Sequence, residues 1–263
     1  MEEKTSAMSG VQARLHAGDG SHKHGGSEGL LEWPSHLEAA RLACTSGGKQ
    51  AASLAIETGA VAIGVVAAIR FLNVQPALTF KWLMIPCLLV IAALLPTWLR
   101  GGEVPPMCLG REQAAASLAL ACITCLIAIP AVFLGLWLMV RMHLPIPLRP
   151  AVAGPDGWFT WLIYQFMYVA VAEEVFFRGY IQGNVMKWLG DARPAGQYIA
   201  MVVSAGCFAL AHVVVQGQIT SLFAFLPGLV LAWLFLRTRS LLAPVLFHGI
   251  ANVSYGVFAS TLT

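Results

Sequence analysis

From about residue 51 onward, long apolar runs alternate with short polar or Pro/Gly-rich breaks. Each run approaches the roughly 20 residues that a membrane-spanning helix needs. We therefore predict seven spans, at approximately residues 52–72, 80–99, 114–140, 157–180, 197–214, 219–237 and 240–260. The runs are continuous rather than alternating, which argues against the strands of a membrane barrel, and lipid excludes open sheets. The predicted fold class is all-α, a polytopic transmembrane helical bundle.

The first 50 residues have a different pattern. They are polar, with a Gly/Ser/His-rich run, too few apolar residues to bury a core, and nothing typical of a signal peptide. We predict a flexible N-terminal tail over residues 1–50 and the bundle over residues 51–263. The one helix expected in the tail is SHLEAARLAC, in which Ser35 and Glu38 can form a capping box.

Composition agrees with a membrane protein, since 58% of the 263 residues are hydrophobic and only 11% are charged. The net charge of +3 comes without a basic, aromatic-rich patch of the kind that binds nucleic acid, so nucleic acid is not an expected partner. The six cysteines follow no disulfide-framework spacing, and we interpret them, including Cys122 and Cys125, as structural. The expected partner is the lipid bilayer.

Lysine and arginine in the breaks predict the orientation. The residues on the N-terminal side are Arg100, Arg111, Lys187, Arg193, Arg237 and Arg239, and those on the opposite side are Lys81, Arg141 and Arg149. By the positive-inside rule the N-terminus is cytoplasmic and the C-terminus is outside. We therefore expect a multi-pass protein of the cell (inner) membrane.

Several polar residues lie inside the predicted spans, where each ionisable group costs about 3 kcal/mol on insertion scales and so needs a partner or a purpose. They are Glu173, Glu174 and Arg178 in the fourth span, His212 in the fifth, and His248 and Asn252 in the seventh.

Helical spacing separates the two glutamates. Glu174 and Arg178 are four residues apart and share a face, so they can form an intrahelical ion pair. Glu173 points about 100° away and has no local counter-charge. It is the better candidate for a general base.

The two histidines also have partners at helical spacing. His248 and Asn252 are four residues apart and project from one face, and Phe208 lies one turn before His212, where its ring can limit the histidine rotamers. Together with Glu173, these groups could converge from three helices on one internal cavity that holds water.

A purely structural role is the alternative for each of these residues. A membrane histidine often hydrogen-bonds a carbonyl, and a buried ion pair often only holds helices together. Glu57 and Arg70 in the first span each lie near a span end or alone, with no matching group, and we assign them no chemistry.

Three short motifs carry a resemblance to a known family. The segments EEVFFR at 173–178, FALAH at 208–212 and HGIAN at 248–252 resemble Glu-Glu-x-x-x-Arg, Phe-x-x-x-His and His-x-x-x-Asn. In this order they mark the CPBP (CAAX protease and bacteriocin-processing, Abi) family of glutamic-type intramembrane proteases. The resemblance covers about residues 157–258, which places the expected catalytic core at 157–260.

The resemblance implies a metal-independent intramembrane endopeptidase that hydrolyses a peptide bond of a membrane-associated protein or peptide. Glu173 would deprotonate a water held between it and His212, and His248 and Asn252 would donate hydrogen bonds to the oxyanion. The supporting residues would be Glu174, Arg178 and Phe208. No cofactor is implied.

Two other functions stay open. A carboxylate and two histidines are plausible zinc ligands, which would make the chain a zinc-dependent membrane protease. A non-catalytic membrane protein, such as an immunity factor, chaperone or transporter, could use the same polar cluster. The substrate, whether a prenylated protein, a bacteriocin leader or a sorting signal, is not determined by the residues.

Overall fold

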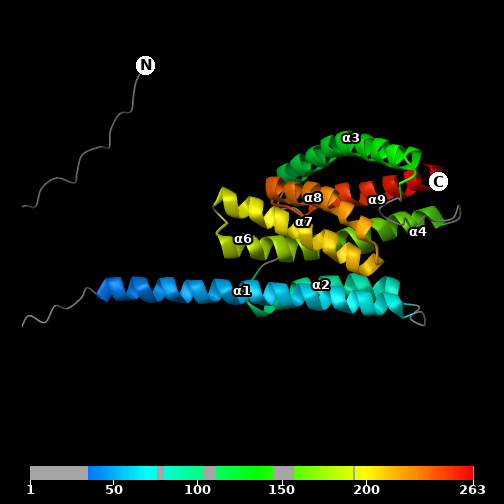
Figure 1. Ribbon diagram of the computed structural model, residues 1–263. Helices are drawn as coiled ribbons and strands as arrows, with labels where there is room; N and C mark the ends of the chain where they lie inside the picture. The colour runs from blue at the N-terminus through cyan, green and yellow to red at the C-terminus, as the bar shows by residue number, and fades with distance from the viewer. Residues whose placement is uncertain (1–34, 76–79, 103–110, 145–156, 192, 263) are drawn as a thin grey trace, which may run out of the picture. The chain divides into compact units, whose positions relative to one another are not determined.

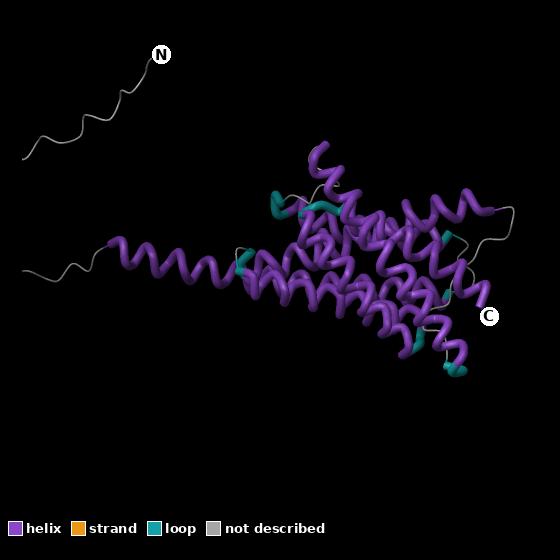
Figure 2. The backbone as a smooth tube through the Cα atoms, turned by 90° about the horizontal axis from the view of Figure 1, so that it is seen from above, coloured by secondary structure: helices purple, strands orange, loops and turns teal. Residues whose placement is uncertain are grey.

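The computed structural model describes residues 35–75, 80–102, 111–144, 157–191 and 193–262, with residues 35–49, 111 and 262 described by their backbone only. All regular secondary structure in these residues is helical (Figures 1 and 2). The predicted all-α fold class is therefore confirmed.

The chain divides into two compact units, Met1–Cys44 and Thr45–Thr263. Within the first unit the described residues are helical and form the start of α1, Ser35–Val74, as the pattern at SHLEAARLAC predicts. The helix continues past residue 50, so the predicted boundary of the tail falls inside α1. The remainder of the predicted tail, 1–34, lies outside the described residues.

Among its described residues, the second unit holds six helical segments long and apolar enough to cross a bilayer, and they coincide with six of the seven predicted spans. The helices are α1, α2 (Lys81–Leu99), α3 (Arg111–Arg141), α7 (Pro194–Gln216), α8 (Phe225–Thr238) with the preceding 3₁₀ turn η4 (Ile219–Ala224), and α9 (Leu242–Leu262). The spanning part of α1 begins at Gln50.

The predicted fourth span, 157–180, is helical but differs from the other six. Its backbone is helical from Trp158 to Leu189, and two π-helical segments interrupt the α-helical pattern. In order, the pieces are α4 (Trp158–Ile163), η2 (Tyr164–Ala170), α5 (Val171–Glu174), η3 (Val175–Gln182) and α6 (Gly183–Leu189). π-Helical turns concentrate at functional sites, and here they flank the glutamate pair.

Local sequence explains where the C-terminal helices begin and end. Pro194 stands at the start of α7, where its missing N–H costs nothing, and Gly217 ends the helix in a left-handed conformation at φ 70°. Arg239 ends α8 at φ 52°. Ser240 Oγ then accepts a hydrogen bond of 3.1 Å from the N–H of Leu242, which opens α9.

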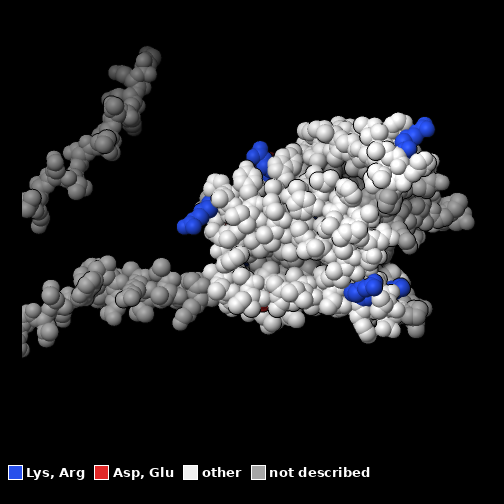
Figure 3. Space-filling view, viewed as in Figure 1, with Lys and Arg blue, Asp and Glu red and all other residues white. Residues whose placement is uncertain are grey.

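Large apolar side chains cover the outside of this unit, and its interior includes many small residues beside large ones. Ile63, Leu126 and Phe159 are each at least 75% exposed. In Figure 3, most lysines and arginines lie toward the ends and the broad middle is almost uncharged. Several alanines are completely buried, which allows the close helix approach typical of membrane bundles. They are Ala93, Ala170, Ala200, Ala205, Ala232 and Ala243.

Candidate active site

Glu174 and Arg178 form the predicted intrahelical ion pair. Arg178 Nη1 donates to Glu174 Oε1 at 2.9 Å, and both side chains are fully buried. Arg178 Nη2 also donates to the carbonyl oxygen of Gly228 on α8 at 3.2 Å. The pair therefore neutralises two buried charges and ties the glutamate-bearing helix to α8.

His248 reaches both glutamates from α9. Its Nδ1 lies 2.7 Å from Glu174 Oε1, and its Nε2 lies 3.8 Å from Glu173 Oε2. Because the carboxylate of Glu174, paired with Arg178, can only accept, the proton of this short contact belongs to His248 Nδ1. The imidazole is thus oriented with Nε2 toward Glu173.

Glu173 has no direct hydrogen-bond donor among the described residues, and its Oε2 atom is buried. The 3.8 Å between this oxygen and His248 Nε2 is too long for a direct hydrogen bond and is a separation that one water molecule can bridge. The side chain as a whole is 20% exposed. This carboxylate is therefore buried on one side and accessible on the other, which a general base that deprotonates water requires.

His212 is oriented by its own helix. Its Nδ1–H donates to the carbonyl oxygen of Phe208 at 2.9 Å, since a carbonyl can only accept. The ring of Phe208 packs against the imidazole with 4.4 Å between centroids. This is the carbonyl bond that the structural alternative expected, and it leaves Nε2 as the free acceptor.

Phe208 contacts more of the site than its spacing predicts. The Arg178 guanidinium carbon lies 4.6 Å from the centre of its ring, and the rings of Phe177 and His248 lie 5.1 and 5.8 Å away in edge-on geometry. The Phe208 ring therefore contacts the arginine of the ion pair and both histidines, and it fixes their positions relative to one another.

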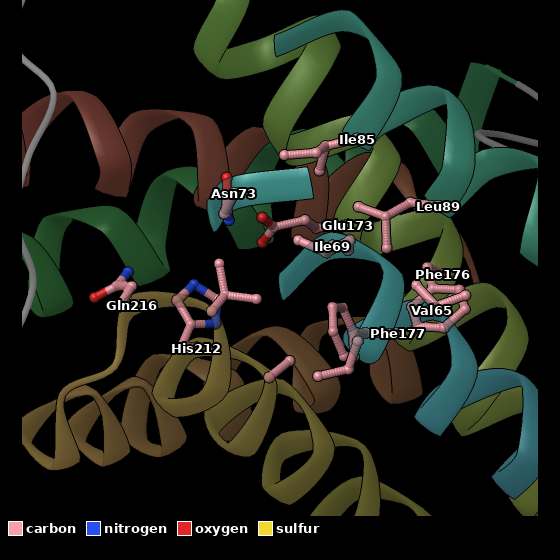
Figure 4. A pocket seen from close by; sticks show the side chains of 13 residues that line it. Val65, Ile69, Asn73, Ile85, Leu89, Glu173, Phe176, Phe177, His212 and Gln216 are labelled. Atoms are coloured by element: carbon pink, nitrogen blue, oxygen red, sulfur yellow. The ribbon is translucent and has the colours of Figure 1, made fainter. Parts of the chain in front are cut away.

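Glu173 and His212 line one cavity of about 160 Å³ (Figure 4). Its other lining residues come from α1, α2, η3 and α7, and they include Asn73, Ile85 and Gln216. The ends of α1 and α7 and the start of α2 lie at the same face of the helical bundle (Figure 1). The cavity is thus displaced toward the face where the spanning part of α1 ends.

His248 and Asn252 stand outside the lining of this cavity. Asn252 Nδ2 donates to Oε1 of Gln165 in η2 at 3.2 Å. Gln165 is buried and was missed by the sequence analysis, although an amide inside an apolar span is the kind of signal that could have found it. The structure thus brings Glu173 together with both histidines, while Asn252 is held one turn of α9 further along.

The interpretation of Glu57 as a residue with no matching group is wrong. Its Oε1 accepts hydrogen bonds from Arg100 Nη1 at 2.8 Å and from the Tyr180 hydroxyl at 3.1 Å. Asn184 Nδ2 donates to Thr58 Oγ1 at 3.1 Å beside it. These contacts tie α1 and α2 to the helix that carries Glu173, and helical spacing could not reveal them because they join different helices.

Within the described residues, no group of three or more His, Cys, Asp or Glu side chains is arranged to hold a metal ion. Glu173 and His212 share the cavity, whereas Nδ1 of His248 is engaged by Glu174.

Residues 155–254 match a protein-family model described as "Type II CAAX prenyl endopeptidase Rce1-like". The matched segment contains all three motifs, and it confirms the predicted resemblance to the CAAX protease family over this part of the chain. No curated protein and no solved structure matches the chain significantly.

Proposed function

We propose that this chain, whose residues 155–254 match a CAAX endopeptidase family, hydrolyses a peptide bond of a membrane-associated protein or peptide through a water activated by Glu173. One observation carries the proposal. Glu173 receives no hydrogen bond from the described residues, shares a cavity with His212 and lies 3.8 Å from His248. Ionisable side chains inside membrane spans usually have a partner. An acid without a hydrogen-bond donor, beside two imidazoles, is therefore suited to accept a proton.

The reaction needs no covalent intermediate. A water held between Glu173 and His212 Nε2 loses a proton to Glu173 while its oxygen attacks the carbonyl carbon of the scissile bond. When the carbon–nitrogen bond breaks, Glu173 returns this proton to the leaving amine. The Nδ1–H bond of His212 to the Phe208 carbonyl supports this role, because it keeps Nε2 free to accept from the water.

His248 and Asn252 stabilise the oxyanion in this mechanism. Because His248 Nδ1–H is donated to Glu174, its Nε2 can donate to an oxyanion only when the ring carries two protons. Asn252 gives one of its two N–H groups to Gln165 and keeps the other for the substrate.

The position of the cavity bears on the substrate. If the N-terminus is cytoplasmic, as the positive-inside pattern predicts, the face where α1 ends is the outer one. That orientation favours a leader or sorting signal over a prenylated cytoplasmic protein.

Comparison of the wild type with the Glu173→Gln variant tests the function. Both proteins are reconstituted in liposomes and incubated with membrane-anchored, internally quenched peptides, and bound peptides are identified by mass spectrometry. We expect the variant to retain peptide while hydrolysis falls by about 10²–10⁴-fold. Glu112→Gln, which changes an exposed glutamate in the first turn of α3, is the matched control.

Equal hydrolysis by Glu173→Gln and the wild type would exclude Glu173 as the base. Wild-type hydrolysis that is lost with a chelator and restored by zinc would favour the zinc-dependent alternative. A wild type that binds these peptides without hydrolysing them would favour a non-catalytic function.

A further inference from the structure

Two carboxamides line the same cavity as Glu173 and His212. Asn73 comes from the last turn of α1, and Gln216 is the last residue of α7 (Figure 4). Asn73 lies outside the segment that matches the protease family, and Gln216 belongs to none of the three motifs. The proposed mechanism uses neither residue.

Gln216 is held with its amide nitrogen available. It follows His212 by four residues, so the two side chains share a face of α7. Ser221 Oγ donates to Gln216 Oε1 at 2.9 Å, which occupies the oxygen and orients the group. The two N–H groups of Nε2 remain as donors.

Asn73 offers both kinds of hydrogen-bonding group. It is half-buried and follows Ile69, another lining residue, by one helical turn. None of the described residues hydrogen-bonds to its carboxamide. Asn73 therefore presents an acceptor oxygen and two N–H donors from the wall formed by α1.

The remaining walls of the cavity are apolar, so the chemistry of its ligand is restricted. Their residues include Val65, Ile69, Ile85, Leu89, Phe176 and Val215. Neutral amides in such a wall do not select a charged group, and they lose their own hydrogen bonds with water if an aliphatic chain covers them. Their best complement is another amide, which has one donor and one acceptor.

A substrate cleaved inside a bilayer exposes such amides. A membrane helix satisfies all of its backbone groups internally, and a peptide bond becomes accessible to a base only when the helix opens around it. The freed N–H and C=O groups then need partners, because unpaired backbone groups are costly in an apolar environment. Side-chain amides beside the base can supply those partners.

We propose that Asn73 and Gln216 form a subsite that binds the backbone amides of an extended, unwound substrate segment next to the scissile bond. Gln216 donates to a substrate carbonyl, and Asn73 accepts from and donates to a neighbouring peptide group. The subsite rests on the proposed peptidase function and deepens it, because it selects peptides that can adopt an extended conformation at the cleavage site.

A peptide that the wild type cleaves is the probe for this subsite. It is resynthesised with a single ester in place of each amide around the cleaved bond, which removes one N–H donor at a time. We expect an ester at one position to raise the wild-type KM about tenfold, and Asn73→Leu to raise the KM for the all-amide peptide by a similar factor. In Asn73→Leu, the same ester should then have little further effect, because both changes remove one interaction.

Gln216→Leu should likewise raise KM and leave kcat within about threefold of the wild type, since the lost interaction is a binding one. Gln75→Leu, which removes a nearby carboxamide outside the cavity lining, is the matched control. Asn73→Ala provides a second test if Asn73→Leu does not elute as a folded protein.

The outcomes separate this proposal from the proposed function. Unchanged KM in the Asn73 and Gln216 variants, or ester and side-chain effects that simply add, overturns the subsite and leaves the peptidase function standing. A wild type that cleaves no peptide, together with a Glu173→Gln variant that traps none, overturns the peptidase function, and the subsite falls with it.

Discussion

His248 Nδ1 lies 2.7 Å from Glu174 Oε1, although 74 positions separate the two residues in the chain. The same oxygen accepts from Arg178 at 2.9 Å. The second glutamate of the EEVFFR motif is therefore more than the partner of an arginine. It orients the imidazole whose other nitrogen faces Glu173.

Glu174→Gln should impair both stability and activity. The change leaves Arg178 as a buried charge without its counter-ion, which typically costs about 3–5 kcal/mol. It also replaces the charged acceptor of the His248 Nδ1–H by a neutral amide oxygen, which accepts a weaker hydrogen bond. We expect a lower midpoint of thermal unfolding and at least a tenfold loss of kcat, measured on detergent-solubilised protein. A variant that unfolds at the wild-type temperature would contradict this role for Glu174.

Glu173→Gln should show the opposite effect on stability. Glu173 Oε2 is buried without a hydrogen-bond partner among the described residues, so a neutral amide removes a desolvated charge. We expect an unfolding midpoint equal to or above that of the wild type, with hydrolysis lost. Parallel unfolding curves of the two glutamine variants measure the contrast, and equal destabilisation in both would refute it.

Gln165 should act through Asn252. Gln165→Leu removes the oxygen that accepts from Asn252 Nδ2, so the amide can turn its oxygen toward the oxyanion. We expect kcat to fall about 10²-fold with KM nearly unchanged, as with Asn252→Ala, and the double variant to be no worse than either single one. Gln165→Glu keeps an acceptor and should retain more of the activity than Gln165→Leu. Additive losses in the double variant would show that Gln165 acts independently of Asn252.

Gly249 should be required for the approach of α9 to η2. A Cβ atom added at this position would overlap the ring of Phe166. Gly249→Ala should therefore cost about 1–3 kcal/mol of unfolding free energy and lower kcat by displacing the adjacent His248. Phe166→Leu should restore part of both losses when it is combined with Gly249→Ala. Gly59→Ala, at a position with open space around it, is the control.

The cavity should be accessible from the outer side of the membrane. In a variant without the native cysteines, Gln216→Cys should react with a membrane-impermeant maleimide added to intact cells. Lys187→Cys, at the opposite face, should react only after the cells are opened. The reverse pattern would place the cavity at the cytoplasmic side and favour a cytoplasmic substrate.

The part of the site that could be predicted from sequence is the part that lies within single helices. Glu174 and Arg178 pair because four residues make about one helical turn, and the same spacing places the Phe208 ring against His212. Spacing within one helix says nothing about other helices. For this reason the partners of Glu57 and the contact between Asn252 and Gln165 were missed.

The fourth span shows a second limit. Its hydropathy predicts a helix, and a helix is present. The two π-helical segments beside the glutamate pair cannot be recognised from the apolar pattern. Such turns are set by how the neighbouring helices pack, and they change the direction in which each later side chain points.

By itself the sequence determined that the protein is a bundle of apolar helices and which polar residues share a helical face, because both depend on a periodicity that the backbone imposes on every helix. Only the tertiary structure decided that His248 lies between two carboxylates and that Asn73, far outside the matched segment, shares a cavity with Glu173. Those relationships depend on how closely helices approach one another, and small residues such as Gly249 and Ala170 set that approach through packing between distant parts of the chain.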